Sequence, residues 1–137
     1  MTGVRQATCV AIEGRGLLIE GPPGSGKSAL ALALIDRGAT LVGDDGVTLD
    51  LRGGTLWAAP PPATAGLIEV RNVGLVSLAT GEAPVALLLR LDPAAPRHVE
   101  AAGLTEIAGV PVPSLAFDPA IPGGAIRAEL ALRLHGA

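Results

Sequence analysis

The segment from residue 21 to residue 28, Gly-Pro-Pro-Gly-Ser-Gly-Lys-Ser, fits the pattern G-x-x-x-x-G-K-[ST] at every fixed position. Glycines at this spacing allow successive backbone N–H groups to turn inward around phosphate oxygens, a concavity that side chains would block. The pattern also constrains the fold, because the loop has to follow a strand and open a helix. Residues 16–19 supply an aliphatic strand, and residues 27–37 supply a run of helix formers that Gly38 ends. The sequence therefore predicts an α/β chain with a nucleotide-phosphate site.

This loop supplies the candidate nucleotide-binding residues, Gly21, Pro22, Pro23, Gly24, Ser25, Gly26, Lys27 and Ser28. Lys27 can reach the β- and γ-phosphates of a nucleoside triphosphate, and the Ser28 hydroxyl can ligate Mg²⁺. The helix that begins near Lys27 directs the positive end of its dipole at the same anion. The alternative is a glycine-rich turn that precedes a helix by chance, a match expected in on the order of 1% of chains this long. We therefore expect ATP and Mg²⁺ as cofactors.

The rest of the chain alternates short aliphatic runs with glycine and proline, which is typical of strands separated by turns. We expect further strands at residues 8–12, 41–42, 47–51, 55–58, 68–70, 75–78, 85–91 and 110–117, and a closing helix at residues 124–134. Residues 85–91 are the most apolar run and predict a strand covered on both faces, whereas the prolines in residues 110–117 predict an edge strand. With no repeat and no domain boundary, a single domain over residues 1–137 is expected, built on a mixed β-sheet with flanking helices.

Composition excludes several classes of protein. Hydrophobic residues make up 49% of the 137 residues and charged residues 17%, which excludes a disordered chain. The net charge of −3 and the absence of tyrosine argue against nucleic-acid binding. Cys9 is the only cysteine, so an internal disulfide and a cysteine-rich metal site are ruled out. The longest uncharged stretch, residues 53–68, contains consecutive prolines and cannot cross a membrane as a helix, so we expect a cytoplasmic protein.

Phosphoryl transfer to an alcohol needs a carboxylate for the metal ion and a base, and two places in the sequence offer one. Asp44 and Asp45 follow the short strand after the loop's own helix, and Asp92 follows the apolar run of residues 85–91. Asp92 stands before Pro93, where aspartate commonly initiates a turn. The adjacent pair would repel a triphosphate unless a cation lay between them, which favours a Mg²⁺ site. We favour the pair, and a small-molecule kinase or NTPase that uses Asp92 remains the alternative.

A wider set of residues resembles the catalytic domain of HPr kinase/phosphorylase. The set comprises the loop with its helix, the segment Asp-Arg-Gly-x-x-Leu-Val-x-Asp-Asp at residues 36–45, and Ile-Glu-Val-Arg-x-x-Gly at residues 68–74. The Glu-[IV]-Arg-x-x-Gly stretch is much more specific to that family than the phosphate loop is. The likeness spans about residues 6–76 and then fades. The resemblance is to the short form found in some bacteria, for which the family's amino-terminal regulatory domain is not expected.

The resemblance implies a P-loop kinase core related to phosphoenolpyruvate carboxykinase, acting on a serine of a small HPr-type phosphocarrier protein. Asp45 would take the serine proton and would return it in the reverse reaction, while Arg71 lies in the segment that supports both directions. The implied catalytic residues are Asp45, Lys27, Asp44 and Arg71, and the implied metal ligands are Ser28 and Glu69. The family's hexamer implies a homo-oligomer.

The sequence departs from the family pattern at two places. Where the family carries a catalytic histidine, this chain has Gln6, which can form hydrogen bonds but cannot exchange a proton near neutral pH. Where the family carries a Pro-Gly-Arg loop, residues 118–124 contain no arginine, and the next one is Arg127. We therefore expect a kinase and leave the phosphorylase reaction open. A nucleotide-sensing module with little catalysis is a further alternative.

Overall fold

The computed structural model describes residues 2–137. In chain order the elements are β1 (Thr2–Arg5), β2 (Thr8–Ile12), β3 (Arg15–Glu20), α1 (Lys27–Asp36), β4 (Thr40–Gly43), β5 (Val47–Arg52), β6 (Thr55–Ala59), β7 (Leu67–Val70), β8 (Gly74–Ser77), β9 (Ala83–Leu91), β10 (Gly103–Ile107), β11 (Val110–Phe117) and α2 (Gly124–His135). Every strand and helix expected from the sequence is present, within a few residues at each end. The predicted α/β fold with a mixed sheet is therefore confirmed.

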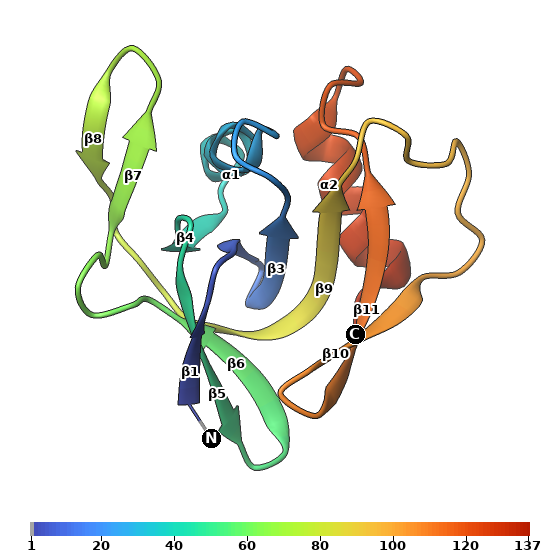
Figure 1. The fold of residues 1–137 in the computed structure, drawn as a ribbon, viewed down its shortest axis with the longest axis horizontal. Helices are drawn as coiled ribbons and strands as arrows, with labels where there is room; N and C mark the ends of the chain where they lie inside the picture. Colours follow the sequence, from blue (N-terminus) through green and yellow to red (C-terminus); the bar gives the residue numbers. More distant parts are fainter. Residues whose placement is uncertain (1) are drawn as a thin grey trace.

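The sheet is organised around β9, which lies at its centre (Figure 1). β3 and β11 both run parallel to β9, on its opposite sides. β2 and β4 continue the sheet beyond β3 in antiparallel pairing, and β6, β5 and β1 continue it from the first residues of β9. Because β3, β9 and β11 are parallel, their carboxyl ends meet at one edge of the sheet, where α/β proteins place their ligands.

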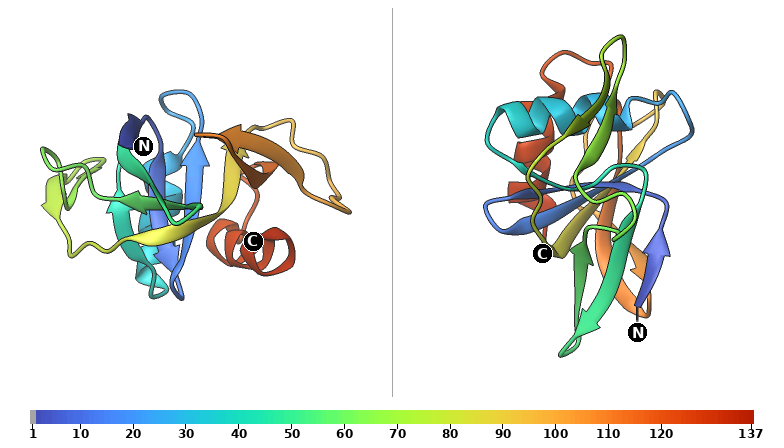
Figure 2. Two further views of the ribbon diagram at one scale, coloured as in Figure 1. Left: turned by 90° about the horizontal axis from the view of Figure 1, so that it is seen from below. Right: turned by 90° about the vertical axis from the view of Figure 1, so that its left-hand side faces the viewer.

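Helices α1 and α2 lie on the same side of this sheet (Figure 2). Along β3 and β9, alternate residues face them: Leu17 and Leu87 belong to the core beneath the helices. The intervening residues Leu18 and Leu88 belong to a second core on the other side, formed with β5, β6, β10 and β11. The predicted strand that is covered on both faces is thus β9.

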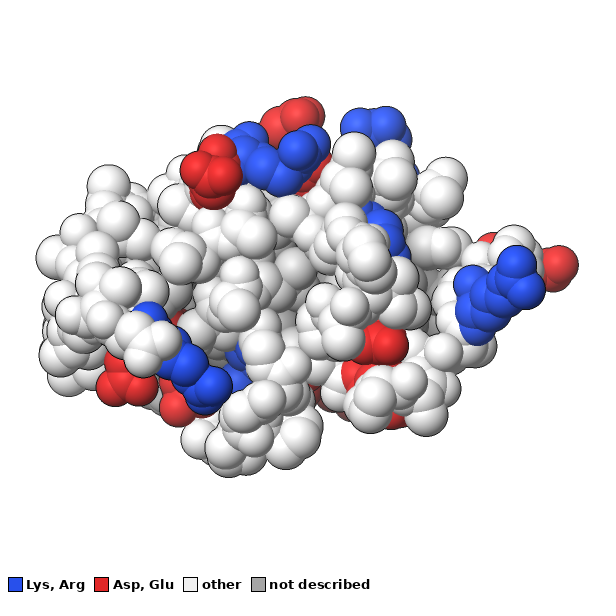
Figure 3. Space-filling view, turned by 90° about the horizontal axis from the view of Figure 1, so that it is seen from above, with Lys and Arg blue, Asp and Glu red and all other residues white. Residues whose placement is uncertain are grey.

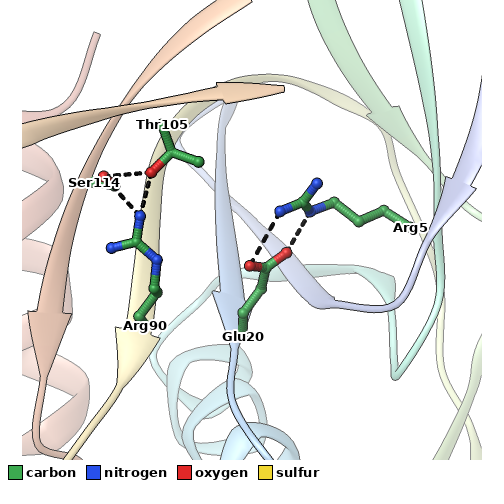
Figure 4. A network of polar contacts seen from close by, with 5 residues as sticks. All are labelled: Arg5, Glu20, Arg90, Thr105 and Ser114. Atoms are coloured by element: carbon green, nitrogen blue, oxygen red, sulfur yellow. Dashed lines mark hydrogen bonds and ion pairs between the residues drawn. The ribbon is translucent and has the colours of Figure 1, made fainter. Parts of the chain in front are cut away.

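Partly buried and exposed polar contacts hold β1 and β10 to this centre (Figure 4). Arg5 of β1 forms a paired contact with Glu20 at the end of β3, its Nη2 lying 3.2 Å from Glu20 Oε1. Arg90 of β9 donates to the hydroxyls of Thr105 and Ser114, which are 2.8 Å from each other. β1 and β10, which the sequence analysis did not predict, are therefore fixed by arginines as well as by strand pairing.

The prediction that residues 110–117 form an edge strand is wrong. β11 pairs with β10 over residues 110–114 and with β9 over residues 114–117. Pro111 and Pro113 both precede the segment that pairs with β9, so neither proline interrupts that ladder. β11 therefore pairs with β9 only beyond its two prolines, yet it lies inside the sheet, between β9 and β10.

β7 and β8 form a separate two-stranded sheet that projects from the body of the molecule beside α1 (Figure 1). Its register pairs Ile68 with Val76 and Glu69 with Leu75. The hairpin is attached through Ile68, which is 1% exposed, and through a bond of 2.8 Å from the Leu78 N–H to the Gly66 carbonyl. A lone hairpin is marginally stable in water, so these attachments determine where it lies.

Candidate active site

The loop at residues 21–28 joins β3 to α1 at the edge where the parallel strands end (Figure 1). Gly26, the N-cap of α1, has a φ of 101°, a left-handed conformation that favours glycine. No side chain caps the helix, so its first N–H groups lack the usual side-chain partner. The Ser25 hydroxyl oxygen is also buried without a partner among residues 2–137. Unpaired donors at a helix N-terminus suit an anion, so the loop fits a phosphate group.

Lys27 connects the first residue of this loop with the aspartate pair. Its Nζ donates to the Gly21 carbonyl at 2.7 Å, and its side chain is 14% exposed. The same Nζ lies 3.8 Å from Asp45 Oδ1. The ammonium group is therefore held between the loop and the predicted base.

The predicted aspartate pair faces the loop from the turn between β4 and β5. Asp44 Oδ1 accepts a hydrogen bond from Ser28 Oγ at 2.7 Å and another from Thr8 Oγ1 at 3.2 Å. The Asp45 N–H in turn donates to Thr8 Oγ1 at 3.2 Å. Thr8 is fully buried at the start of β2 and was not predicted as a site residue. Its only sequence signal is a hydroxyl within an apolar strand, which alone does not indicate a site.

The turn that carries the pair is tightly constrained. A Cβ added to Gly43 would lie 2.1 Å from the Gly46 carbonyl oxygen, so the chain closes on itself at a point where only glycine fits. Asp45 has a φ of 56°, a left-handed conformation that aspartate tolerates better than most residues. The Asp45 side chain is 60% exposed, which leaves its carboxylate open to a reactant from solvent.

A cavity of about 490 Å³ joins the loop to the β7 hairpin. Lys27 and Ser28 line it on one side, and Glu69 and Arg71 line it on the other. The structure thus brings together segments that are 41 residues apart in the sequence, as the family-specific Glu-[IV]-Arg stretch led us to expect. Positive and negative side chains share this cavity, which suits a triphosphate together with a cation.

The donor set fits a Mg²⁺ ion bound mainly through phosphate. Within residues 2–137 no three His, Cys, Asp or Glu side chains group closely enough to hold a metal ion by themselves. Mg²⁺ at nucleotide sites needs only one or two carboxylates besides phosphate oxygens and water. Since the Ser28 hydroxyl donates its hydrogen bond to Asp44, the lone pairs of Ser28 Oγ stay available to a cation.

The alternative metal ligand, Asp92, has a different role in the structure. Its Oδ1 accepts a hydrogen bond of 2.8 Å from the Ala94 N–H, which makes Asp92 the first residue of a turn after β9. None of Asp44, Asp45 and Asp92 lines the cavity between the loop and β7, but Asp44 and Asp45 contact Ser28 and Lys27, which do line it. The arrangement does not favour the hypothesis that Asp92 holds the metal ion.

Gln6 and Arg127, at the two departures from the family pattern, both lie outside the lining of the phosphate cavity. Gln6 is exposed in the link between β1 and β2. The Arg127 guanidinium stacks 4.5 Å from the centre of the Phe117 ring, and its Nη1 donates to the carbonyls of Asp118 and Ile121 at 3.0 and 3.4 Å. Arg127 holds the loop before α2 in place, and it does not reach the phosphate cavity.

The groups whose pKa values are shifted lie outside the phosphate cavity. Burial raises the pKa of the Cys9 thiol from 9.0 to about 12, an effect that a backbone hydrogen bond from Leu17 partly offsets. On the surface, the hydrogen bond from Arg52 lowers the pKa of Glu82. Cys9 packs in the core on the face away from the helices and is not a candidate nucleophile.

Seen from above, the edge that carries the loop and the β7 hairpin shows charged side chains in separate groups with uncharged surface between them (Figure 3). No continuous basic surface appears on this face. Among residues 2–137 there is no helix with both the length and the apolar character required to cross a bilayer.

Comparison with known proteins places these features in one family. The profile of the HPr Serine kinase C-terminal domain matches residues 2–82. The HPr kinase/phosphorylase of Clostridium botulinum (strain Eklund 17B / Type B) is 44% identical over 69 residues, which is 50% of this chain and 23% of that protein. The HPr kinase/phosphorylase of Streptococcus thermophilus (strain LMD-9) is 44% identical over 70 residues, again 50% of this chain and 23% of the relative. The match therefore spans about a quarter of the length of these curated relatives.

The likeness extends further in structure than in sequence. The solved HPr(Ser) kinase/phosphatase from Coxiella burnetii superposes with a TM-score of 0.83 at 26% identity, over 96% of this chain and 89% of that chain. The strands and the helix that follow residue 82 are thus shared in fold, although the sequence profile ends there.

Proposed function

We propose that this chain, which belongs to the HPr serine kinase C-terminal domain family, is an ATP-dependent kinase that phosphorylates a serine on a small phosphocarrier protein of the HPr type. The observation that carries the proposal is the meeting of the aspartate pair with the phosphate loop. Asp44 accepts a bond from Ser28, and Asp45 lies 3.8 Å from the Lys27 ammonium. The names of the relatives support the substrate class.

In the proposed reaction, the loop holds the triphosphate and Asp45 acts on the acceptor. The serine hydroxyl oxygen forms a bond to the γ-phosphorus, the bond from that phosphorus to the β–γ bridging oxygen breaks, and ADP leaves. Asp45 takes the serine proton; its carboxylate is exposed to solvent and lies 3.8 Å from the Lys27 ammonium. Lys27 stabilises the charge that develops on the transferred phosphoryl group.

We assign the metal ligands to Ser28 and Glu69, on opposite walls of the cavity. When bound, Mg²⁺ supplies charge neutralisation to the phosphate oxygens. Asp44 orients the Ser28 hydroxyl by accepting its hydrogen bond, and Arg71 adds a positive charge to the wall that faces the loop.

The two departures from the family pattern bear on the reverse phosphorylase reaction. Gln6 cannot exchange a proton, and Arg127 is engaged with the loop before α2, so neither provides the missing family group. We also propose that the protein acts in the cytoplasm and as a homo-oligomer.

The test is to incubate the protein with Mg²⁺-ATP, an HPr-type phosphocarrier protein and its serine-to-alanine variant, and to measure intact mass. We expect a gain of one phosphate that requires the serine. Asp45→Asn should lower this rate by about 10²–10⁴-fold, because the general base is lost. Asp92→Asn is the matched control and should leave the rate near that of the unaltered protein. The proposal fails if the phosphocarrier gains no phosphate, or if Asp92→Asn alone abolishes transfer in folded protein.

A further inference from the structure

Arg90 carries a positive charge that no carboxylate neutralises within residues 2–137. It follows Leu88 by two positions in β9, so its side chain lies on the sheet face opposite the helices (Figure 4). Its guanidinium forms hydrogen bonds to two hydroxyls and no ion pair with a described residue. Glu20, the residue across from Arg90 in the register of β3 and β9, is already bound by Arg5 through both carboxylate oxygens.

Two neutral hydroxyls fix the orientation of this guanidinium. Ser114 is 3% exposed, and its Oγ lies 2.8 Å from Thr105 Oγ1 and 3.4 Å from Arg90 Nη2. Nη2 also donates to Thr105, whereas Arg90 Nε and Nη1 have no hydrogen-bond partner among residues 2–137. Nε and Nη1 together carry three of the five N–H groups of a guanidinium. An arginine held in one orientation with unused donors is preorganised for an anionic group.

Arg90 and the proposed base Asp45 lie at the same edge of the sheet. β2 is antiparallel to both β3 and β4, so β4 runs parallel to β3 and β9, and the carboxyl ends of all three meet there. β4 and β9 are three strand spacings apart, which is about 15 Å. A protein that presents a serine to Asp45 covers about 800 Å² of this chain, a patch about 30 Å across. Such a partner reaches as far as Arg90, which a small molecule bound at Asp45 does not.

The charges between these two positions favour an acidic contact. Arg5 and Glu20 lie on the strand next to β9 and neutralise each other, so Arg90 leaves the group of side chains in Figure 4 with one surplus positive charge. A carboxylate of a docked protein would be attracted to this charge, and a basic side chain would be repelled.

We propose that Arg90 is a docking residue that binds an acidic side chain of the acceptor protein, with Thr105 and Ser114 holding its guanidinium in place. This inference rests on the proposed function, which supplies a protein acceptor. Arg90 does not line the phosphate cavity. It therefore determines the affinity for the acceptor and leaves the nucleotide and the chemical step unaffected.

The test measures kcat, the KM for the HPr-type phosphocarrier and the KM for ATP, on the unaltered protein and on Arg90→Gln. Glutamine keeps N–H donors for the two hydroxyls and removes the charge. Arg90→Lys keeps the charge. Arg133→Gln is the matched control, since it removes one charge from an exposed side chain in the last turn of α2. Urea unfolding confirms that each variant is folded, and calorimetry with the serine-to-alanine phosphocarrier measures docking without turnover.

We expect Arg90→Gln to raise the KM for the phosphocarrier by about three- to tenfold, with a parallel loss of affinity in calorimetry. The kcat and the KM for ATP should not change. Arg90→Lys should recover part of the loss, and Arg133→Gln should alter none of these values. The difference between Arg90→Gln and the unaltered protein should narrow as the salt concentration rises, because an exposed charge is screened.

An unchanged KM for the phosphocarrier in folded Arg90→Gln would overturn the docking contact. So would a parallel change in kcat and in the KM for ATP, which would show that Arg90 only supports β10. An equal effect of Arg133→Gln would also overturn it, because the net charge alone would then explain the result. Absence of transfer by the unaltered protein would overturn the proposed function itself.

Discussion

Thr8 shows how one buried hydroxyl organises two carboxylates. It donates to Asp44 Oδ1 and accepts the Asp45 N–H, both at 3.2 Å, and it is itself fully buried. The Gly43–Gly46 turn therefore depends on a residue that precedes it by 35 positions. Threonine to valine conserves the shape of the side chain and removes both bonds.

We predict that Thr8→Val destabilises the protein by about 1–3 kcal/mol, because it leaves the Asp45 N–H without its partner. Phosphoryl transfer should fall by more than the loss of folded protein explains, since Asp45 loses its fixed position. Urea unfolding and the transfer rate under conditions of full folding measure the two effects. Thr8→Ser keeps the hydroxyl and should restore the rate. A Thr8→Val protein with an unchanged rate would show that Thr8 does not position the pair.

Cys9 makes the stability of the fold sensitive to alkali. Burial raises the pKa of its thiol from 9.0 to about 12, so the folded state favours the neutral thiol more than the unfolded state does. The unfolded chain therefore binds fewer protons above the ordinary pKa, and the free energy of unfolding falls with rising pH. The contribution is fully present below about pH 9 and is lost as the pH rises toward 12.

The corresponding prediction is that Cys9→Ala flattens the alkaline loss of stability, even though it lowers stability at neutral pH by removing buried atoms. Urea unfolding at about pH 8 and about pH 10.5 measures the slope in both proteins. Equal slopes would mean that the thiol does not contribute. In the unaltered protein the thiol should also react with thiol reagents only after unfolding.

At the scale of single residues, the sequence pattern predicts the phosphate loop but does not predict Thr8, which positions the aspartate pair beside it. The glycines and Lys27 of the loop follow a motif whose geometry is local, so the sequence specifies it. Thr8 contacts the aspartates only because β2 pairs with β3 and β4. The position of Thr8 beside the aspartates depends on tertiary structure, and a short sequence motif carries no information about it.

At the scale of elements, the β7–β8 hairpin decides whether Glu69 and Arg71 reach the phosphate cavity. The hairpin belongs to no larger sheet and is fixed at its base by Ile68. Because few contacts hold it, its local stability is lower than that of the central sheet.

We predict that Ile68→Ala releases the hairpin, with a local loss of about 2–4 kcal/mol for the buried side chain. Amide hydrogen exchange should accelerate across residues 67–77 while β3 and β9 keep their protection. The transfer rate should fall as Glu69 and Arg71 lose their position. Val73→Ala, at a side chain that is 72% exposed on the same hairpin, is the control and should leave both measurements unchanged. Uniformly faster exchange throughout the chain would contradict a locally attached hairpin.

The elements themselves were predictable where periodicity was strong. β3 and β9 are long aliphatic runs beside glycine or proline, and α1 follows from the loop. β1 and β10 were missed because Thr2–Arg5 and Gly103–Ile107 lack a marked alternation of apolar residues. They are strands because neighbouring strands pair with them, and arginines hold them there.

For the whole molecule, the surface of α2 bears on the proposed homo-oligomer. Ile126, Leu130 and Leu134 lie one helical turn apart and are 47%, 41% and 77% exposed. Apolar side chains at this spacing form a stripe along the helix, which favours association between copies of the chain.

We therefore predict that Leu130→Glu lowers the molecular mass in solution, as measured by light scattering on a size-exclusion column. Leu104→Glu, at a side chain that is 71% exposed on β10, is the matched control and should leave the mass unchanged. An unaltered protein that is monomeric at all concentrations would contradict the proposed assembly, and a mass unaffected by Leu130→Glu would place the contact elsewhere.

The phosphate loop lines the 490 Å³ cavity, whereas the Asp45 side chain is 60% exposed to solvent. If the triphosphate lies on the loop and the serine reaches Asp45 from solvent, neither reactant blocks the departure of the other. Catalysis would then pass through a ternary complex that forms in either order, and double-reciprocal plots of initial rates would intersect instead of running parallel.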